Sequence, residues 1–167
     1  MRKPTGKPDE TAKNKIVSTN RKARHDYHIE STMEAGLVLR GTEVKSMRQG
    51  RVNLRDSYAR VEKDGVIIYD MHIAPYDHGN RWNHEPTRPR RLLLRKEQIR
   101  KLTGQVKQEG YTLVPLAAYF TPRGHAKLEL ALARGKKQWD KREDIKKRDA
   151  DREIAKAIRG ENKRGGE

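Results

Sequence analysis

The sequence has no cysteine among its 167 residues. This absence excludes a disulfide scaffold and a zinc site built on thiolates. No apolar run approaches the roughly 18 residues that a membrane-spanning helix needs, and the N-terminus has no apolar signal core. We therefore expect a protein without a membrane segment that works in the cytoplasm.

Most sequence signatures of enzymes are also missing. There is no phosphate-binding loop, no Gly-x-Ser-x-Gly elbow and no paired-glycine dinucleotide fingerprint. Two polar clusters keep weaker alternatives open. His25 and Asp26 have the chemistry of a general acid–base pair, and Asp77, His78 and His84 could hold a metal, although their spacing matches no standard site. We expect no catalysis, no cofactor and no bound metal.

Positive charge is the strongest feature that the sequence does have. The formal net charge is +16 and the isoelectric point is near 10.2. Residues 20–134 contain 22 basic and 13 acidic residues, and residues 135–167 contain 12 and 8, so the excess is not confined to one tail. Such a chain binds polyanions through the release of counterions. A structural ribosomal protein and an RNA-modifying enzyme share this composition and remain alternatives at this point.

Patterning divides the chain into three segments. Residues 1–19 are nearly free of apolar side chains, which predicts a disordered basic tail. Residues 20–134 have the apolar periodicity of a folded RNA-binding body. Residues 135–167 are dominated by charged residues, which predicts a tail that is disordered alone and helical on a partner. Nothing in the sequence indicates oligomerisation, so we expect a monomer.

Periodicity within the body predicts mainly β-structure. Strands are expected from Tyr27 onward and over residues 57–63, 66–73, 111–120 and 125–133, and helices over residues 42–49 and 95–109. An OB-like antiparallel β-barrel with about three helices fits this order of short elements in a basic domain.

Several details of this prediction can be checked directly. Asp64-Gly65 predicts a type I′ hairpin turn, after which Ile67, Tyr69, Met71 and Ile73 fall on one face. Pro115 predicts an edge strand or a bulge. The loop over residues 75–89 is long for a small domain, which is typical of a functional or mobile segment.

Cations next to aromatic and hydrogen-bonding groups identify candidate RNA contacts, because phosphates need the cations and unstacked bases need the rings and polar edges. The first group is Asn20, Arg21, Lys22, Arg24, His25 and Tyr27. The second is Lys45 and Arg48, followed by Arg51 and Arg55. The third is Arg88, Arg90 and Arg91 beside two prolines. Each group has a structural alternative: Tyr27 in the core, a solvated helix face, or a mobile loop.

The segment that follows the last predicted strand contains Gly135, Lys136, Lys137, Trp139, Asp140, Lys141 and Arg142. A tryptophan is out of place in a solvated charged tail, so we expect it to stack on a base while the cations around it contact phosphates. The alternative is that Trp139 folds back onto the barrel.

These segments together resemble the SsrA-binding protein (small protein B) family. The resemblance lies in an ordered set of blocks: Asn-Arg-Lys-Ala-Arg-His-Asp-Tyr at 20–27, Glu-Ala-Gly at 34–36, Gly-Thr-Glu-Val-Lys-Ser at 41–46, Asp-Ser-Tyr-Ala at 56–59, Arg-Leu-Leu-Leu at 91–94, Gly-Tyr-Thr-Leu-Val-Pro-Leu at 110–116, and Gly-Lys-Lys-Gln with Asp-Lys-Arg at 135–142.

The resemblance implies a function that composition cannot supply. Family members have an OB-like barrel, bind the tRNA-like domain of transfer-messenger RNA (tmRNA) and deliver it to stalled ribosomes. Their C-terminal tail enters the empty mRNA channel past the decoding centre. By motif position, Glu34 and Leu93 match the tmRNA-binding surface, and Asn20 and His25 match positions near RNA at the decoding end. The tail residues that match the part engaging the ribosome are Gly135, Lys136, Lys137, Asp140, Lys141 and Arg142. Arg95 and Trp139 depart from the usual family residues.

Overall fold

The computed structural model describes residues 14–164, except for the side chains of residues 108–109, 138–140 and 157–164. The chain divides between Arg134 and Gly135 into two units, each of which is described by itself. The expected disorder of residues 1–13 lies outside the described residues. For residues 15–19 that expectation is wrong, because they form a strand paired with residues 117–120.

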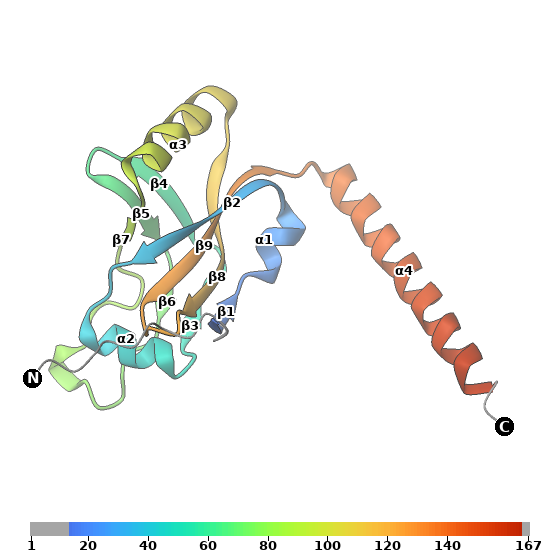
Figure 1. The fold of residues 1–167 in the computed structure, drawn as a ribbon, viewed down its shortest axis with the longest axis horizontal. Helices are drawn as coiled ribbons and strands as arrows, with labels where there is room; N and C mark the ends of the chain where they lie inside the picture. The colour runs from blue at the N-terminus through green and yellow to red at the C-terminus, as the bar shows by residue number, and fades with distance from the viewer. Residues whose placement is uncertain (1–13, 165–167) are drawn as a thin grey trace, which may run out of the picture. The chain divides into compact units, whose positions relative to one another are not determined.

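The first unit is built mainly of strands (Figure 1). These are β1 (Lys15–Thr19), β2 (Tyr27–Leu37), β3 (Val52–Asn53), β4 (Tyr58–Glu62), β5 (Gly65–Tyr69), β6 (His72–Ile73), β7 (Arg90–Leu93), β8 (Thr112–Phe120) and β9 (Ala126–Gly135). Its helices are α1 (Arg21–Asp26), α2 (Gly41–Arg48), the short 3-10 helix η1 (Asn80–Trp82) and α3 (Lys96–Glu109). The prediction did not include α1: the first strand was expected to begin at Tyr27, and residues 20–26 were assigned no helix.

Six strands close into a ring in the order β8-β4-β5-β7-β2-β9, and β1 adds to β8 outside the ring. The described pairings, such as β4 with β5 and β8 with β9, are antiparallel. This arrangement confirms the mainly β, barrel-like fold class. Helices α2 and α3 lie at opposite ends of the ring (Figure 1), where Met47 and Leu102 enter the central core.

The predicted hairpin is present, but its turn differs from the prediction. Glu62 pairs with Gly65, so Lys63 and Asp64 form the turn, and the positive φ of 128° falls on Gly65. The prediction of one face for Ile67, Tyr69, Met71 and Ile73 is also wrong. In β5 it is Val66 and Ile68 that are buried inside the ring, while Ile67 and Tyr69 are half-buried on the other face. Met71 and Ile73 are buried in the core because a positive φ of 56° at Asp70 ends β5 and reverses the alternation before β6.

A bulge in β8 confirms the prediction made from Pro115. The register against β9 shifts between Pro115 and Ala117. An extra residue reverses the alternation of a strand. As a result, Leu113 precedes the bulge and faces the central core, while the even-numbered Ala118 and Phe120 face it after the bulge.

A second, smaller core lies on the other face of β8 and β9. It consists of Val114, Leu116, Ala131 and Ala133, which are covered by Ala23 of α1. Both faces of these strands are therefore buried near α1, which explains why residues 113–120 read as one continuous apolar run rather than as an alternation.

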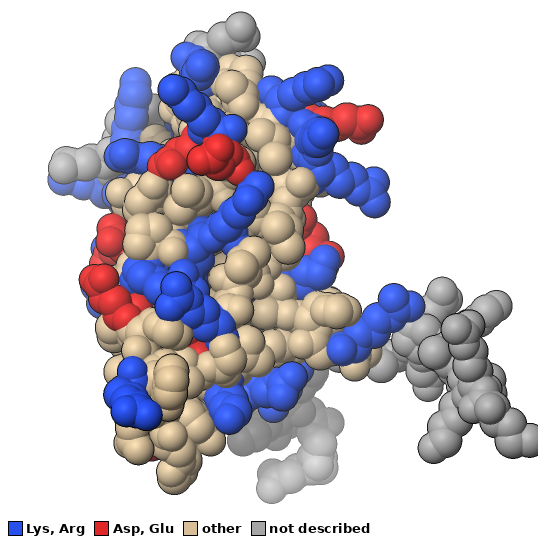
Figure 2. Space-filling view, turned by 90° about the vertical axis from the view of Figure 1, so that its left-hand side faces the viewer, with Lys and Arg blue, Asp and Glu red and all other residues tan. Residues whose placement is uncertain are grey.

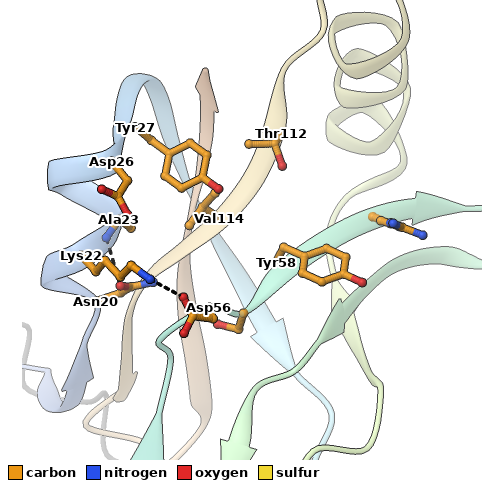
Figure 3. Close-up of a pocket in the computed structure, with 11 residues that line it drawn as sticks. Asn20, Lys22, Ala23, Asp26, Tyr27, Asp56, Tyr58, Thr112 and Val114 are labelled. Carbon is orange, nitrogen blue, oxygen red and sulfur yellow. Dashed lines mark hydrogen bonds and ion pairs between the residues drawn. The ribbon is translucent and has the colours of Figure 1, made fainter. Parts of the chain in front are cut away.

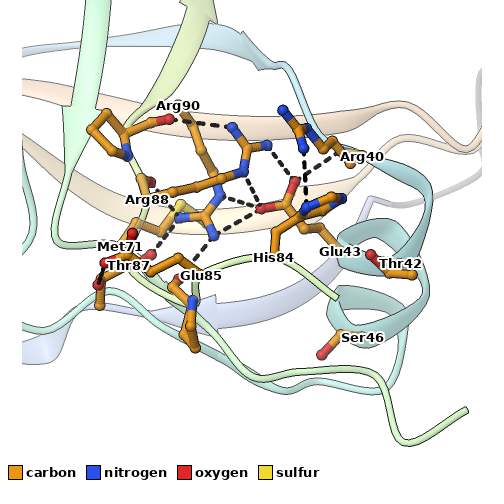
Figure 4. Close-up of polar contacts among 12 residues, drawn as sticks. Arg40, Thr42, Glu43, Ser46, Met71, His84, Glu85, Thr87, Arg88 and Arg90 are labelled. Atoms are coloured by element: carbon orange, nitrogen blue, oxygen red, sulfur yellow. Dashed lines mark hydrogen bonds and ion pairs between the residues drawn. The ribbon is translucent and has the colours of Figure 1, made fainter. Parts of the chain in front are cut away.

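A buried carboxylate ties α2 to the segment that precedes β7 (Figure 4). Glu43 accepts hydrogen bonds from Arg88 Nε at 2.8 Å, from Arg90 Nε at 2.9 Å and from the backbone N–H of Arg40 at 2.8 Å. Arg90 is only 1% exposed, and its guanidinium also donates to the carbonyls of Met71 and Pro86. The predicted contact of Arg90 with phosphate is therefore wrong. Of the other two arginines in that predicted group, Arg88 and Arg91, only Arg91 is exposed.

The second unit contains α4 (Gln138–Arg164). The structure gives this segment as a helix, and the predicted disorder of the tail when it is alone stays a prediction. No glycine or proline interrupts residues 136–159, and oppositely charged residues recur at helical spacing, as Asp144 and Arg148 do four residues apart. Lys136, just before the helix, forms an ion pair with Asp144. None of the helices in the described part of the chain is long and apolar enough to span a membrane.

Replacing Glu43 with glutamine tests the buried ion network. The E43Q variant keeps the shape but leaves two guanidiniums without a counter-charge, and we expect a loss of about 3–5 kcal/mol in the free energy of unfolding. Urea denaturation measures this loss. The matched control is D77N, which removes an exposed carboxylate paired with Arg51 at 2.7 Å and should change stability little. Equal effects of the two variants would contradict the role of Glu43.

The pH dependence of the E43Q effect follows from the pKa of Glu43. Burial by itself raises that pKa, but the hydrogen bonds from Arg88 and the Arg40 backbone and the charges of Arg90 and Arg88 outweigh it, so the pKa lies below the usual 4.5. A carboxylate with a lowered pKa stabilises the fold above its unfolded pKa and loses that contribution as pH falls through the folded pKa. The stability difference between wild type and E43Q should therefore be full at pH 6 and should shrink below about pH 4.5; a constant difference would contradict this account.

Candidate nucleic-acid interface

Helix α1 is held in place by the side chain of Asn20. Its Oδ1 accepts from the backbone N–H of Ala23 at 3.1 Å, and its Nδ2 donates to the carbonyls of Leu54 at 3.0 Å and Pro115 at 3.1 Å. Asn20 is only 6% exposed. Its amide is therefore fully used within the protein, and the structure does not support the predicted direct contact of this group with RNA. Asn20 positions α1 instead.

The other predicted residues of this segment lie on α1 with their charges outward. Arg21, Lys22 and Arg24 are exposed, and Ala23 is the residue that faces the core. Nδ1 of His25 lies 2.9 Å from Oδ1 of Asp26, which orients the imidazole so that its other nitrogen is left for a partner. One turn of helix thus presents three cations and a histidine on the same small element.

A pocket of about 500 Å³ lies between α1, β4 and β8 (Figure 3). Tyr27 and Tyr58 line it from opposite sides, and Lys22 Nζ forms an ion pair of 2.6 Å with Asp56 across it. The hydrogen bond to Lys22 holds the pKa of Asp56 below its usual value. Tyr27 also packs against the second core, so the core alternative for this residue is in part correct.

An aromatic pair that sequence reasoning missed extends this pocket along the outside of the β4–β5 hairpin. The rings of Tyr58 and Tyr69 stack with centroids 5.6 Å apart, and the guanidinium of Arg60 lies 5.2 Å from the Tyr58 ring. The signal was available in the alternation of residues 58–62, but the strand register was needed to place Tyr69 opposite Tyr58.

Glu34 and Leu93 come together on the outer face of the ring. Leu93 pairs with Gly36 across β2 and β7, and Glu34 lies two residues along on the same face of β2. Leu93 is 56% exposed, which is unusual for leucine on a sheet. Arg95, two residues further on, caps α3 and is exposed.

The carboxylate of Glu34 is held by two neighbours. It accepts hydrogen bonds from Lys127 Nζ at 2.8 Å and from the hydroxyl of Tyr119. These bonds lower the pKa of Glu34, so the group is ionised at neutral pH despite its place beside a pocket of about 390 Å³. A fixed carboxylate accepts hydrogen bonds from base amino groups or ribose hydroxyls.

The exposed face of α2 presents both of its predicted cations. The Nζ of Lys45 lies 5.4 Å from the ring of Tyr76, and the guanidinium of Arg48 lies 5.6 Å from the ring of Phe120. Arg51 is neutralised by Asp77, and Arg55 lies 3.7 Å from Asp56. Figure 2 shows Lys and Arg side chains spread over one side of the body, with carboxylates gathered mainly toward its edges.

The residues considered for a metal site do not converge. Asp77 is paired with Arg51, and His84 Nδ1 accepts from Arg40 at 3.0 Å, while His78 packs edge-on against Tyr76. Among the described residues, no group of three or more His, Cys, Asp or Glu side chains is placed to hold a metal ion.

The predicted tail residues belong to the second unit. Gly135 ends β9, Lys136 pairs with Asp144, Lys137 directly precedes α4, and Lys141 and Arg142 lie in its first two turns. Lys137 and Arg142 are exposed, and Lys141 is half-buried. The side chains of Trp139 and Asp140 lie outside the described residues, so stacking by Trp139 and its alternative both stay predictions.

Comparison with known proteins yields a consistent result. The family model described as SmpB protein matches residues 17–160. The SsrA-binding protein of Moorella thermoacetica is 60% identical over 149 residues, which cover 89% of this chain and 96% of that protein. The SsrA-binding protein of Geobacillus thermodenitrificans is 58% identical over 149 residues, with the same coverage of 89% and 96%.

A solved structure described as "tmRNA-SmpB: a journey to the center of the bacterial ribosome" has a similar fold. It is 51% identical in sequence, has a TM-score of 0.62, and the match covers 74% of this chain and 85% of that chain.

The N20D variant tests the structural role of Asn20. Aspartate is as good a helix N-cap as asparagine, but its carboxylate cannot donate to the carbonyls of Leu54 and Pro115. We expect N20D to lower the free energy of unfolding by about 2–4 kcal/mol, because a buried carboxylate then faces the carbonyls of Leu54 and Pro115 and the Asn20 donor bonds to both are lost. The Leu54 carbonyl keeps its bond from the hydroxyl of Ser57. Thermal and urea unfolding measure the loss, and R21A on the exposed side of α1 serves as the control. Wild-type stability of N20D would show that the donor bonds are dispensable.

Proposed function

The chain belongs to the SmpB protein family, and from this premise we propose that it binds the tRNA-like domain of tmRNA and delivers it to stalled ribosomes for trans-translation. The observation that carries the proposal is the match of the family model to residues 17–160, together with relatives of 58–60% identity named SsrA-binding protein. The net charge of +16 supports an RNA partner independently.

The body contributes two surfaces to this function. One is the outer face with Glu34, Leu93 and Arg95, which combines a fixed carboxylate, an exposed apolar side chain and a cation. We assign this face to tmRNA, because an apolar contact and a carboxylate acceptor suit sugar and base edges better than phosphates. The fold supplies the rigid sheet that such shape-dependent contacts need.

The second surface is α1 with its adjoining pocket. Arg21, Lys22, Arg24 and His25 offer charge to a phosphate backbone, and Tyr27 with Tyr58 offers ring surface to a base. We assign it to RNA at the decoding end. We also assign Lys45 and Arg48, on the exposed face of α2, to contacts with RNA phosphates.

The tail acts separately from the body. We propose that the basic segment from Gly135 to Arg142 engages the ribosome and that α4 reads the empty mRNA channel. The helical conformation of residues 138–164 supports a tail that occupies the channel as a helix. The three-part division, with a basic tail at each end of the RNA-binding body, stays part of the proposal.

The protein works in this proposal as a monomeric adaptor in the cytoplasm, without catalysis or cofactor. Its role in this proposal is binding alone: it binds tmRNA and delivers it to the ribosome. The His25–Asp26 contact is accordingly assigned to orienting an RNA ligand rather than to general acid–base catalysis.

Removing residues 135–167 separates the two activities. We expect a truncated chain ending at Arg134 to bind a tRNA-like-domain transcript with near wild-type affinity in a gel shift, because the body keeps its own core. Peptide tagging on ribosomes stalled without a stop codon should be abolished. Replacing Lys136, Lys137, Lys141 and Arg142 together with alanine in the full chain should have the same effect, and persistent tagging would disprove the role of these cations.

Opposite charge changes at α1 test the assignment of that surface. R24A removes an exposed cation and should weaken RNA binding by several-fold and reduce the slope of log affinity against log salt by about 0.7–0.9. D56N removes the carboxylate that pairs with Lys22 and should strengthen binding, and asparagine tolerates the positive φ of 61° at this position. Filter binding at several salt concentrations measures both. Changes of the same sign, or no change, would contradict the assignment.

A further inference from the structure

Trp82 is more exposed than any other large hydrophobic residue in the described part of the chain. Its exposed fraction is 68%, compared with 56% for Leu93. Tryptophan has the largest ring surface of the side chains, and leaving it in water forgoes the free energy of burial. An exposed indole on a folded element offers a flat ring surface on which a ligand can stack.

The loop that carries Trp82 is held rather than mobile. The side chain of Asn83 accepts from the backbone N–H of Tyr76 and donates to its carbonyl, both at 2.9 Å. Trp82 closes η1, and its carbonyl accepts from the hydroxyl of Thr42 on α2 at 3.4 Å. The loop thus presents the indole from a fixed backbone, which lowers the entropy cost of binding through it.

Positive charge lies beside this indole and on the segments around it. The guanidinium of Arg81 lies 5.2 Å from the ring, and Arg40 donates at 3.0 Å to Nδ1 of His84, which follows Trp82 by two residues. A guanidinium can only donate, so His84 accepts here and keeps its Nε2–H as a donor. Among the described side chains, Arg40, Lys45 and Arg81 form no ion pair with a carboxylate.

We propose that Trp82 and Arg81 form a stacking site for one unpaired RNA base, with Arg40 and Lys45 placed for the adjoining phosphates. This inference rests on the proposed RNA-binding function and adds a contact on a loop that lies apart in sequence from α1, from the Glu34–Leu93 face and from the tail. Cations without carboxylate partners favour a polyanion over a protein surface, and an indole stacks on any base because every base has a π-face. The base belongs either to tmRNA or to ribosomal RNA.

Indole fluorescence tests the site directly. The chain has two tryptophans, so W139F in the full-length protein leaves Trp82 as the reporter. Three probes are titrated: a short single-stranded RNA, a tRNA-like-domain transcript and a small-subunit ribosomal RNA transcript. An abasic oligonucleotide of the same length as the short RNA is the matched control, because it keeps the phosphates but cannot stack. Binding of each probe is measured in parallel by filter retention.

Stacking predicts saturable quenching by the short RNA and little quenching by the abasic control. Quenching by the tRNA-like domain identifies tmRNA as the source of the base, and quenching by the ribosomal transcript alone identifies the ribosome. In the same background, W82A should weaken binding of the quenching RNA roughly 5-fold to 150-fold, and W82F should weaken it less. The exposed position means that both variants should unfold at the wild-type temperature.

Two outcomes overturn parts of this account separately. If the RNAs bind but none quenches Trp82, or if the abasic control quenches equally, the stacking site is wrong and the proposed function stands. A loss of ribosome-dependent tagging in W82A without any RNA quenching would also overturn it and would indicate a protein contact. If the tRNA-like domain does not bind at all, the proposed function fails, and the short RNA then decides the stacking site on its own.

Discussion

The carboxylate of Glu43 connects two segments that are far apart in the sequence. It accepts hydrogen bonds from the backbone N–H of Arg40, which precedes α2, and from the guanidiniums of Arg88 and Arg90 at the start of β7. Charges this deeply buried are costly unless each has its partners, and here Arg90 also has carbonyl acceptors on its remaining nitrogens. The end of the ring closed by α2 depends on this network.

The same network shapes the surface as well as the core. The network holds α2 against the segment after η1. In this position the hydroxyl of Thr42 donates to the carbonyl of Trp82, and Arg40 donates to Nδ1 of His84. The exposed cations of α2 and the exposed indole are thereby fixed relative to one another. A structural interaction made by buried residues thus determines which charged and aromatic groups stand together outside.

The bulge of β8 positions α1 in a similar way. It reverses the alternation of the strand at Pro115. The carbonyls of Pro115 and Leu116 accept hydrogen bonds from Asn20, which fixes the start of α1. The pocket between Tyr27 and Tyr58 exists because α1 is held there. The surfaces around α2 and α1 therefore depend on two separate features, a buried ion network and a bulge.

The sequence by itself determined the mainly β class, helices α2 and α3, the hairpin, the bulge and the basic character of both body and tail. Periodicity, helix-ending glycines and charge counts are local properties, so they can be read without knowing the fold. The ordered family blocks also pointed to the RNA partner, which charge alone could not identify.

Only the tertiary structure decided which residues of those blocks face outward. Arg90 and Asn20 looked like RNA ligands, yet partners 19 to 95 positions away bury them. Residues 15–19 looked too polar to fold, yet β8 supplies their backbone partners. Tyr58 and Tyr69 became a stacked pair only through strand register. Burial and hydrogen bonding depend on what the rest of the chain brings alongside, and local sequence carries no record of that.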